Sequence, residues 1–177
     1  RPPDRTAPTK LDFPGRAGRS RPLARDQERP RLAKPPDFMP YQITRKHEIH
    51  CGHRVVGHEG KCRNLHGHSY VFHFTCEAEG LDSLGRVVDF GVIKAVLCQW
   101  LEENWDHRML IWEHDPILAA LRVLDDSIVA VPFNPTAENM AAHMARVVGP
   151  ALLQDHAVRL VRVHLEETGK CSATYFG

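Results

Sequence analysis

The 177-residue sequence lacks any apolar run close to the roughly 20 residues of a membrane-spanning helix, and its first residues lack the apolar stretch of a signal peptide. It also lacks a charge excess, because 23 lysines and arginines face 22 aspartates and glutamates. That balance gives no electrostatic reason to bind nucleic acid or an acidic membrane directly. We therefore expect a cytoplasmic protein whose partners are set by local sites.

Cysteine is sparse, and the spacing of the cysteines matches no paired motif. The five cysteines are an odd number and form no C-x-x-C pair, which argues against a disulfide framework and favours reduced thiols. Histidine is the compositional anomaly: the chain has 12, and seven of them fall between His47 and His73. This segment is where a metal site is expected.

The chain divides by composition into a tail and one domain. Residues 1–38 are rich in proline and arginine and poor in large apolar residues, so we predict a disordered tail. A basic arm for RNA is a weaker alternative, because acidic residues dilute its charge. The predicted domain covers residues 39–177, and Met39 is a candidate native start.

Apolar periodicity predicts strands, then helices, then strands. This order favours an α+β fold, in which a four-stranded antiparallel sheet carries two main helices on one face. Exposed sheet edges favour oligomerisation. The predicted elements are strands at 41–49 and 68–78, a helix at 89–103 with Asp89 as its cap, a short helix at 116–124, an apolar run at 128–131, a helix from 135 to 148 stopped by Gly149 and Pro150, and strands at 159–165 and 172–176.

A metal site is predicted around His66 and His68. Two residues apart on a strand, their imidazoles point to the same face, and the intervening Gly67 leaves the other face clear. His53, at the end of the first extended segment, is the expected third ligand, with His50 or His58 as alternatives. Three imidazoles and an open position are typical of catalytic zinc, although three histidines also accept other divalent ions.

Six motifs in one order resemble the 6-pyruvoyltetrahydropterin synthase superfamily. The three-residue gap between Cys62 and His66 is similar to that of its 6-carboxytetrahydropterin synthase branch, which serves queuosine biosynthesis. The motifs are I-x-x-G-H-R around His53, C-x-x-x-H-G-H from Cys62 to His68, Val88-Asp89-Phe90-Gly91, Trp105-Asp106-His107-Arg108, Pro135-Thr136-Ala137-Glu138-Asn139, and Glu167-Thr168.

The resemblance implies a tunnelling fold whose subunits trimerise into a twelve-stranded barrel. Two trimers stack into a hexamer, and the active sites fall at subunit contacts. It also implies a zinc-dependent lyase that converts 7,8-dihydroneopterin triphosphate to 6-carboxytetrahydropterin, acetaldehyde and triphosphate. Two alternatives remain open: a 6-pyruvoyltetrahydropterin synthase using the same site, and an oligomer that binds zinc or pterin without catalysis.

The resemblance also implies roles for individual residues. Cys62 would remove a proton from the substrate as a thiolate, and Asp106 would orient His107 for proton transfer on the other side of the substrate. Glu167 would anchor the pterin, because a carboxylate accepts two parallel hydrogen bonds from its aminopyrimidinone edge. Glu138 either completes a helix start or lines the pterin pocket, and Thr136 is a further candidate substrate contact.

Overall fold

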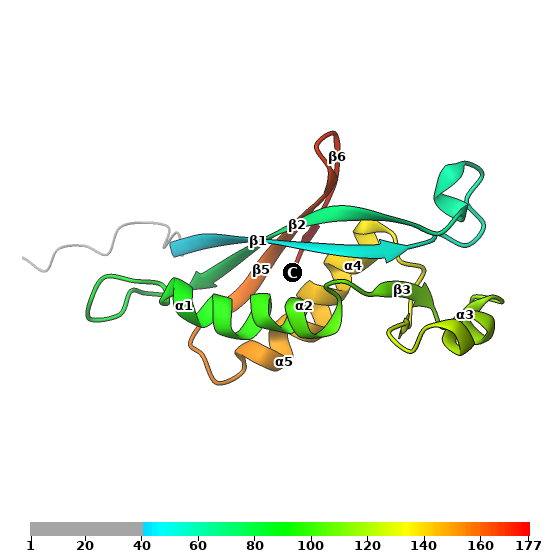
Figure 1. Ribbon diagram of the computed structural model, residues 1–177. Coiled ribbons are helices and arrows are strands. Elements are labelled where there is room, and N and C mark those ends of the chain that lie inside the picture. Colours follow the sequence, from blue (N-terminus) through cyan, green and yellow to red (C-terminus); the bar gives the residue numbers. More distant parts are fainter. Residues whose placement is uncertain (1–40) are drawn as a thin grey trace, which may run out of the picture. The chain divides into compact units, whose positions relative to one another are not determined.

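The computed structural model describes residues 41–177 (Figure 1), so the predicted tail at 1–38 lies outside the described residues. No helix in the described range is both long and apolar enough to cross a membrane. In chain order, the elements are β1 Tyr41–His53, η1 Lys61–Arg63, β2 His66–Ala78, α1 Phe90–Ile93, η2 Lys94–Cys98, α2 Gln99–Asn104, β3 Met109–Trp112, α3 Leu118–Leu124, β4 Val129–Val131, α4 Ala137–His143, η3 Met144–Val148, α5 Gly149–Leu153, β5 Arg159–Thr168 and β6 Cys171–Phe176.

The strands form one sheet in the order β4-β3-β1-β2-β5-β6. Its main part is the predicted antiparallel set of β1, β2, β5 and β6. The structure adds two short strands, because β3 runs parallel to the end of β1 and β4 runs parallel to β3. These strands have only four and three residues, too few for their alternation to be recognised in the sequence.

The two main helical segments cover one face of this sheet (Figure 1). The first runs through α1, η2 and α2, and the second through α4, η3 and α5, each with a π-helical turn in its middle. The predicted stop at Gly149 and Pro150 is wrong, because α5 continues to Leu153. Gly149 instead permits close packing: a Cβ there would lie 2.4 Å from a methyl carbon of Leu160.

The alternation of β2 separates a core face from a polar face. Tyr70, Phe72 and Phe74 are fully buried against the helices, and the rings of Phe72 and Phe74 stack at 5.8 Å. The residues between them, including His73, therefore point to the face that the helices leave uncovered. The sheet thus carries polar side chains on both of its faces.

Asp89 is the N-cap of α1, as the sequence predicted. Its carboxylate accepts a 2.7 Å hydrogen bond from the Gly91 amide and a 2.8 Å bond from the Arg86 guanidinium. We expect Asp89→Ala to lower the free energy of unfolding by about 0.5–2 kcal/mol, the usual cost of losing a cap. Denaturant titration measures this loss, and Asp89→Asn, which keeps an acceptor oxygen, should recover most of it.

Candidate functional site

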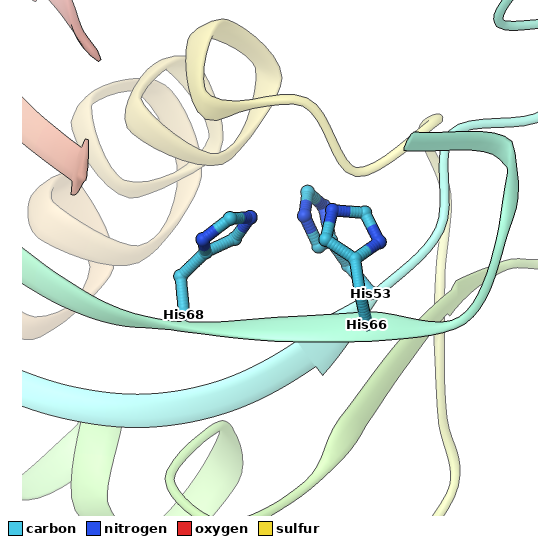
Figure 2. A group of neighbouring side chains, drawn as sticks. All are labelled: His53, His66 and His68. Atoms are coloured by element: carbon cyan, nitrogen blue, oxygen red, sulfur yellow. The ribbon is translucent and has the colours of Figure 1, made fainter. Parts of the chain in front are cut away.

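Three histidine rings converge where β1 ends and β2 begins (Figure 2). His53 lies directly opposite His66 in the antiparallel register, and His68 is two residues further along β2. The ring centroids are 4.4 Å apart for His53 and His66, 5.2 Å for His53 and His68, and 4.9 Å for His66 and His68. One ligand nitrogen from each ring falls within 4.8 Å of the others, which suits a single metal ion.

Backbone carbonyls fix the tautomers of two of these rings. Nδ1 of His53 lies 2.6 Å from the Pro135 oxygen, and Nδ1 of His66 lies 2.8 Å from the Asn64 oxygen. A carbonyl only accepts hydrogen bonds, so each Nδ1 carries the proton and each Nε2 keeps its lone pair. This is the usual support of a metal-binding imidazole.

In two of these rings the Nε2 nitrogen has no hydrogen-bond partner among the described residues. Nε2 of both His53 and His68 is buried without a hydrogen bond, a costly state that a bound cation would relieve. Burial lowers the pKa of His53 and also that of His68, which keeps both rings neutral and able to bind a metal. These residues therefore fit the predicted metal site, and His53 rather than His50 or His58 is the third member of the cluster.

Beside the metal cluster lies a hollow of about 310 Å³ that gathers four more of the predicted residues. Cys62 reaches it from η1, Thr136 and Glu138 from the start of α4, and Glu167 from β5. The Thr136 hydroxyl also caps α4 by accepting from the Asn139 amide at 3.3 Å. Glu138 lies in the first turn of α4 and also lines the hollow, which agrees with both of its predicted roles, at the helix start and in the pterin pocket.

A bulge in β5 directs Glu167 into the site. The pairing with β6 shifts register between Glu166 and Thr168, so Glu167 has no cross-strand partner. Its carboxylate lies 3.6 Å from Nε2 of His53 and 3.4 Å from the Tyr70 hydroxyl. Glu166 points to the other face, as the sequence predicted, and contacts His73 there.

Asp106 and His107 form the predicted pair, and His107 lines a different hollow from that of Cys62. Nδ1 of His107 lies 2.7 Å from the Asp106 carboxylate, whose other oxygen accepts from the His50 amide at 2.8 Å. Burial alone would raise the pKa of Asp106, but these hydrogen bonds outweigh it and lower the pKa. The second hollow is lined by His50, His68 and Ser69 as well as His107, but Cys62 is not among its lining residues.

Sequence reasoning missed several residues of the Cys62 hollow. Cys171 and Ser172 line it from β6, and His58, predicted as a solvated residue or an alternative metal ligand, lines it from the loop after β1. The one available signal for Cys171 and Ser172 was the predicted pairing of the last two strands, which puts both residues beside Glu167. Arg54, the residue after His53, makes a 3.0 Å ion pair with the buried carboxylate of Asp115.

The α+β sheet carries a three-histidine cluster beside a thiol and a carboxylate, an arrangement suited to an enzyme that uses a metal ion. The sequence model of the 6-pyruvoyl tetrahydropterin synthase family matches residues 42–177, and the chain belongs to this family. The chain is 37% identical over 132 residues to 6-carboxy-5,6,7,8-tetrahydropterin synthase of Rickettsia bellii, covering 73% of this chain and 96% of the relative. It is 31% identical over 162 residues to the enzyme of the same name from Aquifex aeolicus, covering 77% and 98%.

Solved structures share the fold. An uncharacterized protein from Wolinella succinogenes superposes with a TM-score of 0.70 at 24% identity, covering 78% of this chain and 99% of its own. The 6-pyruvoyl tetrahydropterin synthase of Caenorhabditis elegans gives a TM-score of 0.59 at 23% identity, covering 79% and 97%. The predicted α+β class is therefore confirmed.

Proposed function

We propose that this chain is a zinc-dependent lyase that converts 7,8-dihydroneopterin triphosphate to 6-carboxy-5,6,7,8-tetrahydropterin, acetaldehyde and triphosphate, an early step towards queuosine. The observation that carries the proposal is the convergence of His53, His66 and His68 beside the hollow lined by Cys62 and Glu167. The names of relatives 35–37% identical to this chain support the same activity.

The three imidazoles would hold zinc, which when bound supplies a Lewis acid that polarises the oxygens of the substrate side chain. Cys62 would take the proton from the adjacent carbon, and its place in the same hollow as His53 puts it within reach of a side chain held there. Glu167 would accept hydrogen bonds from the pterin ring. Thr136 and Glu138 would contact the ring from the start of α4.

The second proton-transfer group would come from a neighbouring subunit. Asp106 holds His107 in one orientation, but His107 lines a hollow whose lining does not include Cys62. We propose that oligomerisation, as a hexamer of two trimers, brings His107 of one copy to the Cys62 hollow of another. Light scattering of the purified full chain gives the oligomer mass directly.

The deciding experiment incubates zinc-loaded protein with 7,8-dihydroneopterin triphosphate and identifies the products by chromatography with mass detection. Trapped acetaldehyde together with 6-carboxytetrahydropterin supports the proposal. Triphosphate release with a 6-pyruvoyl product would assign the alternative activity, which the family's own name favours. Metal and pterin binding without turnover would instead favour a non-catalytic binding protein.

Glu167→Gln should weaken pterin binding, because the amide presents a donor where the pterin edge also donates. Loss of charged hydrogen bonds predicts about a 10- to 100-fold rise in KM for the pterin substrate. Glu113→Gln is the matched control: the same change at a glutamate that lies 3.5 Å from His114 and does not line the Cys62 hollow. Equal KM increases in both variants would contradict the anchoring role of Glu167.

A further inference from the structure

A second cluster of metal-binding side chains lies on the face of the sheet that the helices leave uncovered. His73 of β2 stands directly opposite His164 of β5, and Glu166 follows two residues later on the same side of β5. Phe72, Leu165 and their buried neighbours separate this cluster from the core face, which carries His53, His66 and His68. The two clusters therefore lie on opposite sides of one sheet.

The ligand atoms of this second cluster are already gathered. One nitrogen from each histidine and one oxygen of Glu166 lie within 4.8 Å of one another. Tetrahedral zinc, with bonds near 2.0–2.1 Å, needs ligand atoms about 3.3 Å apart. The widest pair must therefore close by at most about 1.5 Å, which side-chain rotation can supply.

Hydrogen bonds orient the donors of the cluster. Nε2 of His73 lies 2.6 Å from Oε1 of Glu166, and Nδ1 of His164 lies 2.8 Å from the Thr174 hydroxyl on β6. When the Thr174 oxygen accepts from Nδ1, the Nε2 lone pair of His164 is free for a metal. For a metal to bind Nε2 of His73, the ring must take the tautomer with its proton on Nδ1, and the cation then replaces the N–H as the partner of the Glu166 carboxylate.

The chemistry of the donors selects the kind of ion. Two imidazoles and one carboxylate suit zinc, cobalt, nickel or copper, whereas calcium and magnesium prefer oxygen ligands alone. Burial lowers the pKa of His164, and His73 lowers it further, so the His164 ring is neutral near pH 7. Arg162 and Lys46 also lower the pKa of His164, whereas the Glu166 carboxylate raises it and supplies the negative charge that attracts a cation.

We propose that His73, His164 and Glu166 form a second binding site for a divalent transition-metal ion, separate from the catalytic cluster. The ion would bridge β2 and β5 next to the bulge that β5 makes at Glu167 in its pairing with β6. The site needs no substrate and does not depend on the proposed reaction. Its failure and the failure of the proposed function are therefore distinguishable.

The test counts Co²⁺ ions on the full chain after chelator treatment, by equilibrium dialysis and elemental analysis. Wild-type protein should bind two equivalents per chain. Both His164→Ala and His66→Ala should bind one, and the double variant should bind none. A single equivalent in wild type, or two in His164→Ala, would overturn the second site.

Further variants separate metal binding from folding. Glu166→Gln keeps the side-chain shape and should also lose one equivalent of metal. This variant tests the second site if His164→Ala does not fold. Thr174→Val should weaken the second equivalent by about 10- to 100-fold, as expected for loss of a supporting hydrogen bond. His114→Ala is the control: this exposed histidine also lies beside a glutamate, 3.5 Å from Glu113, and its loss should leave both equivalents.

Discussion

Cys62→Ala should reduce turnover of 7,8-dihydroneopterin triphosphate by about 10²- to 10⁴-fold, the usual contribution of a positioned base. The variant should keep its metal, because the metal cluster consists of His53, His66 and His68 and does not include the thiol. Cys62 is only partly buried on a short helical turn, so its truncation leaves little cavity. Steady-state kinetics and metal content measured on the same preparation check both expectations.

Cys171→Ala is the matched control, because this second thiol lines the same hollow from β6. It should retain most of the turnover. If Cys171→Ala is inactive and Cys62→Ala is active, the base has been assigned to the wrong thiol.

Mixing variants tests whether the site is shared between subunits. Cys62→Ala and His107→Ala should each be inactive alone, since each removes one of the proposed proton-transfer groups. After joint refolding, oligomers that contain both variants should regain turnover where an intact Cys62 hollow meets an intact His107. No recovery, in mixed oligomers verified by mass, would place both groups in one chain's site.

His66→Ala should lose the catalytic metal and nearly all turnover. A metal-supporting residue outside the coordination sphere typically contributes 10- to 100-fold in affinity, so removal of a ligand should cost more than about 100-fold. His66 is a better choice than His53, whose ring is 1% exposed and whose loss would also disturb packing. Calorimetric titration of chelator-treated protein with zinc measures the affinity.

Metal restoration separates loss of the ion from loss of the fold. Chelator-treated wild type should recover turnover when zinc is added back, whereas His66→Ala should not at the same zinc concentration. His156→Ala, in the turn between α5 and β5, is a histidine control and should behave as wild type. Full turnover of His66→Ala without added metal would contradict the proposed ligand set.

The metal cluster was predictable because its residues are local in the sequence. His66 and His68 share a face through the period of two of any strand, and His53 is the last residue of the strand that pairs with them. The support of His53 was not predictable: its partner, the Pro135 carbonyl, lies 82 residues away. Only the packing of the α4 start against the end of β1 brings the two together.

The same distinction applies to Asp106, His107 and Glu167. The sequence identified the Asp-His pair and the alternation that points Glu166 and Glu167 to opposite faces. It could not indicate that His107 lines a hollow other than that of Cys62, because separations between distant loops depend on the folded chain. The bulge at Glu167 likewise arises from pairing with β6.

By itself, the sequence determined the α+β class, the four main strands, the cap at Asp89 and the three clustered histidines, because each depends on local periodicity or on short motifs. The tertiary structure decided the two added parallel strands, the continuation of the helix through Gly149, and the second cluster of His73, His164 and Glu166. Each of these depends on which strands or helices become neighbours. That choice is made by burial of the common core, to which residues far apart in the chain contribute together.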